Sequence, residues 1–174
     1  MVAALWVLDY MFTLAANGCR GVNMETGVNQ LGFISSYSPI GDDEHGHYSA
    51  RPEYYGMLAF SLAAKGRLLK TELGSNSPAV KAYATQPEKG PLALALINKG
   101  AVASDLAVNT PGRRASFVRL SGPAVDARTG ITLGGAEVTS AGTWKPAKSE
   151  VLPIRKGQFR INLPAASAAV VHIA

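Results

Sequence analysis

An apolar stretch at residues 4–16 constrains the fold of this chain more than any other feature, because it has helical spacing and almost no polar face. Leu5, Leu8 and Phe12 follow i, i+3 and i+7 spacing, and Asp9 marks the narrow strip that looks accessible to water. Gly18 is a suitable stop for the helix. A helix that is apolar nearly all round must be buried on several sides, so we expect other elements to pack around it.

The next residues predict one strand and a second helix. Residues 21–25 predict a short strand, and residues 26–51 predict a long loop. Pro52 stands at the favoured first-turn position of a helix that we expect to end at Gly66. The first 66 residues therefore predict the order helix, strand, long loop, helix.

From residue 67 onward, short runs are separated by glycine, proline, asparagine and serine, which is typical of antiparallel strands. Residues 92–97 are apolar on both faces, as expected of a central strand, whereas residues 158–163 alternate, as expected of a strand with one face in water. The predicted strands cover residues 67–72, 79–85, 92–98, 104–108, 115–120, 136–139, 151–154, 158–163 and 168–173.

These patterns predict a mainly β (α+β) fold, in which an antiparallel β-sandwich of about eight or nine strands follows a helix-strand-loop-helix segment. We expect two domains, residues 1–66 and residues 67–174. The side chains expected to form the core of the sandwich are Val80, Leu94, Leu96, Phe117, Phe159, Ile161 and Val171.

The net charge of +5 is unevenly distributed along the chain. Residues 1–60 hold two basic and six acidic side chains, net −4, whereas residues 61–174 hold fifteen and six, net +9. A basic second part could attract an anionic polymer, either nucleic acid or an acidic polysaccharide. Its cations are spread over many segments without interleaved aromatic side chains, so we favour a solvated sheet surface over nucleic-acid binding.

Simple signals argue against several other classes of function. Cys19 is the only cysteine, so an internal disulfide and a cysteine-based metal cluster are excluded, and we expect Cys19 to be a small core residue. Residues 42–47 hold five Asp, Glu and His side chains, but adjacent residues cannot all converge on one ion, so a solvated loop is expected. No cofactor is expected, because no cofactor-binding motif occurs.

Membrane insertion and export are not expected either. No apolar run approaches the ~20 residues of a membrane-spanning helix. The first apolar stretch is not preceded by a basic residue, and Asp9 lies within it, both of which are wrong for a signal peptide. Localisation therefore stays open at this point.

Four segments together resemble the end of the catalytic region of glycoside hydrolase family 79, the β-glucuronidase and heparanase family. They are ALWVLDY at 4–10, GVN at 21–23, SYSPI at 36–40 and RPEYYGMLAF at 51–60. The run LPAASAAVVHI at 163–173 is similar to the closing strand of the family's C-terminal sandwich. The resemblance implies that residues 1–66 are a remnant of the last αβ units of a (β/α)8 TIM barrel, and that residues 67–174 are the C-terminal β-sandwich.

The family's activity, as the resemblance implies it, is that of a retaining glycosidase acting on glucuronic-acid linkages. Such an enzyme uses two glutamates whose carboxyl groups lie about 5 to 5.5 Å apart. The family places its acid after the fourth barrel strand and its nucleophile at the seventh, whereas this chain begins on the helix after the seventh. We therefore expect no catalytic residue in this chain, and whether the chain is an enzyme is left open.

The resemblance also implies candidate substrate-binding residues. In the family, a glycine-x-tyrosine element binds the substrate carboxylate through a backbone N–H and a phenol O–H, both good donors to an anion. The matching triplet, Ser35-Ser36-Tyr37, keeps the phenol and has Ser35 in place of the glycine. Glu25 would lie at the C-terminal end of the eighth strand, where barrel active sites form, although the family more often has histidine near this position. A solvated or arginine-paired carboxylate is the alternative for Glu25.

Three hypotheses about function remain. The first is a C-terminal part of a family 79 glycosidase, inactive as a lone chain and in need of a barrel partner. The second is an accessory module for acidic carbohydrates such as glucuronides, with Trp144 as the loop aromatic to test for stacking and Trp6 in the core. The third is a self-associating structural protein, a homo-oligomer joined through exposed apolar side chains, namely Leu5, Trp6, Phe12, Tyr55, Leu58 and Phe60.

Overall fold

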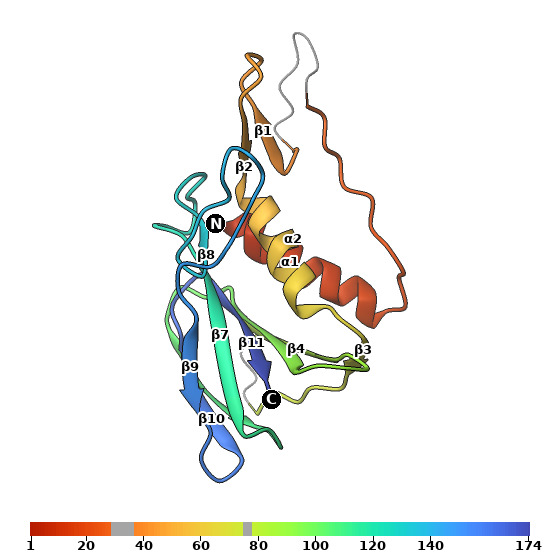
Figure 1. Cartoon of the computed structure of the whole chain (residues 1–174), viewed down its shortest axis with the longest axis vertical. Helices are drawn as coiled ribbons and strands as arrows, with labels where there is room; N and C mark the ends of the chain where they lie inside the picture. The colour runs from red at the N-terminus through yellow and green to blue at the C-terminus, as the bar shows by residue number, and fades with distance from the viewer. Residues whose placement is uncertain (29–36, 75–77) are drawn as a thin grey trace.

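The computed structural model describes residues 1–28, 37–74 and 78–174, which form two helices packed on an antiparallel sheet (Figure 1). This arrangement confirms the predicted mainly β fold. None of the described helices is long and apolar enough to span a membrane. The elements are α1 Val2–Ala16, β1 Ile40–Asp42, β2 Tyr48–Ala50, α2 Pro52–Ala63, β3 Arg67–Leu69, β4 Val80–Gln86, β5 Leu92–Asn98, β6 Ser104–Asn109, β7 Arg114–Ser121, β8 Thr132–Leu133, β9 Glu150–Pro153, β10 Gln158–Leu163 and β11 Ser167–Ile173.

The main sheet has seven strands in the order β3-β4-β5-β11-β7-β8, with β9 paired to the first half of β7. β11 lies between β5 and β7, so that Val170 is opposite both Ala95 and Val118. β10 and β6 form a separate two-stranded sheet, and β1 and β2 form a hairpin. Apart from the hairpin, the molecule therefore has three layers: the helices, the main sheet and the β10–β6 pair.

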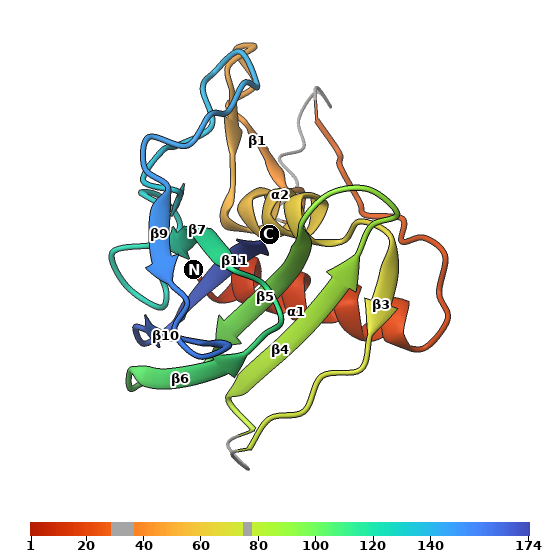
Figure 2. The same ribbon diagram turned by 60° about the horizontal axis from the view of Figure 1, so that its bottom comes forward.

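The helices cover one face of the main sheet, and in Figure 2 the strands β4 and β5 cross in front of α1. Phe12 of α1 is 1% exposed and packs edge-on against Phe60 of α2, with 4.8 Å between ring centroids, and flat against Tyr83 of β4 at 4.7 Å. A Cβ added to Gly56 of α2 would lie 2.2 Å from the carbonyl oxygen of Ala4. The two helices are therefore as close as a glycine allows.

The opposite face of the main sheet packs against the β10–β6 pair. Phe159 and Ile161 of β10 point into this second core, where they meet Leu94, Phe117 and Val171 of the main sheet. The core predicted for the sandwich is confirmed, because each of its seven side chains is buried: Val80, Leu94, Leu96, Phe117, Phe159, Ile161 and Val171.

An apolar cleft of about 580 Å³ remains on this second face, between the main sheet and β6. Leu94 and Leu96 of β5 line it from the main sheet, and Leu106 and Val108 line it from β6. The β10–β6 pair thus covers its face of the sheet less completely than the helices cover theirs.

The predicted strands match the structure well, with β5 and β10 found at the predicted residues. The exception is the strand predicted at 136–139, which is replaced by β8 at Thr132–Leu133. The chain turns at Gly134 and Gly135, both with positive φ, and Ala136 then forms only an isolated bridge to Leu133. After the turn, the backbone N–H groups of Val138 and Thr139 donate to the Tyr55 phenol and to the carbonyl of Thr143, so this segment does not pair as a strand.

The region between the helices differs from the prediction in two ways. Residues 21–25 do not form a strand, and in Figure 1 the chain after α1 loops away from the helices on the right. A strand forms only where a neighbouring strand satisfies its N–H and C=O groups, and the residues described beside this segment form none. The predicted loop at 26–51 was also wrong in part, because it contains the β1–β2 hairpin, whose turn is closed by Asp43 and by Gly46 at φ +82°.

Most of the apolar side chains that were expected to lack cover are covered. These side chains are covered because the helices pack on the main sheet. Trp6 is the one residue of the expected patch that is exposed, at 51%. The division into domains 1–66 and 67–174 stays a prediction. The side chains of the expected patch that are buried are Leu5, Phe12 and Tyr55, and those that are half-buried are Leu58 and Phe60.

Candidate functional site

The predicted substrate-binding residues lie on exposed segments. The Tyr37 side chain is 78% exposed. Glu25 is exposed, and its Oε1 accepts a hydrogen bond of 2.9 Å from the backbone N–H of Gly27. Ser35 lies outside the described residues. Neither Tyr37 nor Glu25 lines the cavity of about 630 Å³ that is described below.

Arg51, the residue before α2, holds the chain that follows Tyr37. Its backbone N–H donates to the carbonyl of Pro39 at 2.9 Å, and its Nη1 donates to the carbonyl of Ser38 at 3.3 Å. A Cβ on Gly41 would come within 3.2 Å of the Arg51 Nε, so the side chain lies against the hairpin. Tyr37 therefore projects from a point that is fixed to the start of α2.

A polar cavity of about 630 Å³ opens between the hairpin, the start of α2 and the loop at 128–131. Arg51 and Glu53 line it from the helical side, and Arg128 and Glu137 line it from the sandwich side. Guanidinium groups donate hydrogen bonds and carboxylates accept them, so such a lining can bind a ligand with several hydroxyl or charged groups. Sequence reasoning missed this cavity because its walls are far apart in the chain.

Two titratable groups of the cavity have shifted pKa values. Burial raises the pKa of Glu53, because removal from water disfavours the charged carboxylate. Burial also raises the pKa of Tyr55, whose phenol oxygen accepts a hydrogen bond of 3.0 Å from the backbone N–H of Val138. The hydrogen bond between Val138 and Tyr55 joins α2 to the segment after β8.

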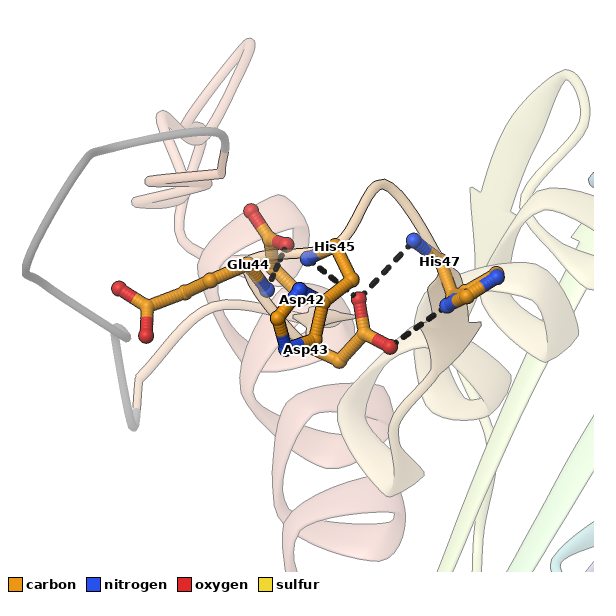
Figure 3. A network of polar contacts seen from close by, with 5 residues as sticks. All are labelled: Asp42, Asp43, Glu44, His45 and His47. Atoms are coloured by element: carbon orange, nitrogen blue, oxygen red, sulfur yellow. Dashed lines mark hydrogen bonds and ion pairs between the residues drawn. The ribbon is translucent and has the colours of Figure 1, made fainter.

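The acidic hairpin turn at 42–47 uses its side chains to close the turn (Figure 3). Asp43 Oδ1 accepts hydrogen bonds from the backbone N–H groups of His45 at 2.9 Å and His47 at 3.0 Å, and Oδ2 lies 2.7 Å from His47 Nδ1. The hydrogen bond with His47 lowers the pKa of Asp43 to about 2. The Glu44 side chain points away from this pair, and no metal-ligating group of three side chains occurs in the part of the chain that is described.

Asp9 links α1 to the main sheet, although the sequence had placed it on a wet strip. Its Oδ1 accepts a hydrogen bond of 2.6 Å from the phenol of Tyr83, and its Oδ2 pairs with Lys99. Burial, followed by the hydrogen bond to Asp9, raises the pKa of Tyr83 to about 12. The Thr13 hydroxyl lies 3.2 Å from the same phenol. These contacts position the helix on the strands.

The predicted environments of Trp6 and Cys19 were wrong, whereas Trp144 lies in a loop as expected. Trp6 is exposed and stacks on Tyr10 with 5.0 Å between ring centroids. Trp144 is half-buried against the helix-side core, and its Nε1 donates to the carbonyl of Leu133 at 3.1 Å. Cys19 is exposed rather than buried. The i, i+4 spacing of Trp6 and Tyr10 was the signal that could have revealed a shared face of α1.

Comparison with known protein families shows which family the chain belongs to. The sequence pattern of the glycosyl hydrolase family 79 C-terminal beta domain matches residues 82–170, just over half of the chain. The chain belongs to this family. The predicted resemblance to family 79 is thereby confirmed. The main sheet and the β10–β6 pair form the family 79 C-terminal beta domain, and α1 and α2 precede it in the chain.

Solved structures share the fold of this family 79 chain. A 4-O-α-L-rhamnosyl-β-D-glucuronidase from Fusarium oxysporum 12S is similar with a TM-score of 0.77 and 20% identity, over 98% of this chain and 38% of that chain. The MgGH51 α-L-arabinofuranosidase matches with a TM-score of 0.70 and 16% identity, over 98% of this chain and 27% of that one. The GH30 xylanase C of Talaromyces cellulolyticus gives 0.63 and 10%, over 98% and 35%.

At these identities the likeness concerns the fold alone. The family 79 chain spans well under half the length of each of these three structures. A comparison with curated proteins found no match. The family match and the shared fold establish that this chain contains the C-terminal beta domain of a glycoside hydrolase.

Proposed function

We propose that the chain is the C-terminal part of a larger glycoside hydrolase and has no hydrolytic activity on its own. The observation that carries this proposal is the mismatch in coverage, because 98% of this chain corresponds to only 38% of the Fusarium glucuronidase chain. A retaining glycosidase needs two facing carboxyl groups in a closed site. Glu25, the predicted substrate-facing carboxylate, is exposed and bonded to the backbone N–H of Gly27.

The surface of α1 supports docking of a barrel. Trp6 and Tyr10 form a stacked pair that is 51% and 37% exposed, and Val2 on the same helix is 57% exposed. Aromatic side chains of this kind dominate the binding energy of protein interfaces. Residues 21–25 form no strand, so their backbone groups can pair with a strand supplied by the barrel. We infer that this side of the helices is the docking face for the barrel.

The first test is hydrolysis of an aryl β-glucuronide by the purified chain. We expect a rate equal to that of buffer, because the proposal assigns the two catalytic carboxyl groups to the barrel. The Glu25→Gln variant and a matched control, Glu44→Gln on the exposed hairpin turn, are assayed in parallel. Turnover that is abolished by Glu25→Gln and kept by Glu44→Gln would overturn the proposal.

The second test is co-expression with the barrel segment of a family 79 glucuronidase, followed by affinity capture of the barrel. We expect capture of this chain, and a loss of roughly tenfold or more in the Trp6→Ala/Tyr10→Ala variant. The control variant Val102→Ala/Val151→Ala removes two apolar side chains that are 74% and 62% exposed elsewhere, and it should be captured like the parent. Equal loss in both variants, or no loss in either, contradicts docking through α1. A homodimer that only the aromatic variant abolishes would assign this face to a second copy instead.

A further inference from the structure

Cations that are scattered in the sequence gather at one end of the main sheet. β3 begins at this end opposite the last residue of β4, β5 begins opposite the end of β11, and β7 begins opposite the ends of both β11 and β9. In Figure 1 this end lies along the lower side of the molecule, where the C-terminus is marked, and Figure 2 brings it forward. Each turn at this end carries basic side chains, which we call the cationic row: Arg67, Lys89, Arg113, Arg114, Arg155 and Lys156.

The register places the turns of the row next to one another. Arg114 lies opposite Pro153, the last residue of β9, and Arg155 follows only two residues beyond the end of this strand. The backbone N–H of Thr110 donates to the carbonyl of Gly157 at 2.8 Å, which ties the chain before Arg113 to the turn after β9. Six strands meet at this end, and five spacings of about 4.8 Å give the row a length of about 24 Å.

The side chains of the row are exposed, and none has an acidic partner within 4.0 Å among the residues described. The nearby negative groups are Glu88 in the β4–β5 turn and the carboxylate of Ala174, whose O accepts the backbone N–H groups of Arg113 and Arg114. Toward the opposite end of the sheet two cations have acidic partners, Lys99 with Asp9 and Lys148 with Glu150. The six cations of the row have no such partner among the residues described.

We propose that the cationic row binds an acidic polysaccharide that lies across the strand ends. A row of about 24 Å suits an extended polymer with repeated negative charges, whereas a small anion would contact only one turn. The residues of the row are not accompanied by exposed aromatic side chains, so stacking on nucleic-acid bases is not available there. This inference is independent of catalysis and of barrel docking, since it concerns neither Glu25 nor the exposed face of α1.

The test compares retention on immobilised heparin, a sulfated uronate polymer, for two variants of equal net charge. Arg113→Ser/Arg114→Ser/Arg155→Ser removes three cations of the row. Arg20→Ser/Lys145→Ser/Arg160→Ser removes three exposed cations elsewhere, and both variants change the net charge from +5 to +2. We expect roughly tenfold weaker binding and a shallower salt dependence for the row variant alone, because fewer counterions are released. Circular dichroism checks that both variants are folded.

A third variant, Arg67→Ser/Lys89→Ser, removes cations from the other half of the row and should weaken binding by an intermediate factor. Equal weakening in the row variant and its charge-matched control would show that retention follows net charge, and the proposal would be overturned. Passage of the parent chain through heparin at low ionic strength would overturn it as well. Tighter retention on double-stranded DNA than on heparin would reject the polysaccharide in favour of a nucleic acid.

Discussion

The two faces of the main sheet are covered by different means. On one face, α1 and α2 pack so closely that Gly56 touches the Ala4 carbonyl, and Phe12 fits between two aromatic rings. On the other face, the β10–β6 pair leaves an apolar cleft of about 580 Å³ beside β4 and β5. Both faces bury large side chains, but the cleft beside β4 and β5 lies on the β10–β6 face, whereas the cavity on the helix side lies at the start of α2 and is not lined by these strands.

This difference in packing predicts where a substitution in the core should lower stability most. A filled core cannot relax around a deletion or an insertion, whereas a core beside a cleft can move its walls or accept added atoms. Residues 1–63, which precede the family 79 match, therefore contribute packing that the sandwich does not reproduce on its other side. Paired substitutions, one on each face, measure this contrast directly.

The largest effect is expected from deleting one buried ring on each face. Phe12 and Phe159 are each 1% exposed, and replacing either with alanine should lower the free energy of unfolding by about 3–5 kcal/mol. Phe12→Ala should fall at the upper end of that range because Phe60 and Tyr83 hold the walls of the hole apart. Phe159→Ala should fall at the lower end, since its partner Val108 lines the cleft. Urea unfolding measures both, and a larger loss for Phe159→Ala would contradict the contrast.

A smaller effect, of opposite sign on the two faces, is expected from adding atoms. Ala84 lines the cleft and Ala59 is fully buried in α2. Ala84→Leu should stabilise the fold by about 0.5–2 kcal/mol by filling space, whereas Ala59→Leu should destabilise it by about 1–3 kcal/mol through overpacking. Thermal unfolding of the two variants gives the sign of each change. If both variants are destabilised to the same degree, the cleft does not accept a side chain.

The smallest effect concerns the polar link between α1 and the sheet at high pH. Tyr83 has a pKa raised to about 12 in the folded chain, against 10.0 for an unperturbed tyrosine. The folded state therefore holds the phenol proton more tightly, so this contribution to stability is complete below pH 10 and is lost as the pH rises toward 12. One proton limits the slope to about 1.4 kcal/mol per pH unit, and partial exposure reduces it further.

The measurement is urea unfolding between pH 9 and pH 11 for the parent, Tyr83→Phe and the exposed control Tyr48→Phe. Tyr83→Phe should remove part of the pH dependence, and Tyr48→Phe should keep it. An identical slope in all three proteins would show that Asp9 and Tyr83 do not interact in solution as they do here.

The sequence predicted those elements whose signal is local. The apolar run of β5 and the alternation of β10 gave both strands at their observed residues, and Pro52 marked the start of α2. The strand predicted at residues 21–25 was wrong because a strand-like sequence pattern does not show whether a neighbouring strand is present to pair with it. The β1–β2 hairpin was missed because its signal is the Asp43 and Gly46 turn rather than an apolar run.

The candidate sites were harder to predict because they depend on which segments meet. Trp144 lies in the loop where the sequence placed it, but the sequence did not reveal that its indole donates to the carbonyl of Leu133 across a turn. The cationic row could not be recognised in the chain order, since only the insertion of β11 between β5 and β7 brings the β4–β5 turn near Arg114. Charge clusters made by strand order require the topology to be known.

The position of β11 has a consequence for biosynthesis. Residues 167–173 are last among the strands in chain order, yet they join β5 to β7 at the middle of the sheet. During translation the earlier strands can form only two separate halves of the main sheet. Until β11 joins them, α1 and α2 have no complete sheet to pack against. Closure by long-range pairing is slow, so the nascent polypeptide should remain dependent on chaperones until its final strand has left the ribosome.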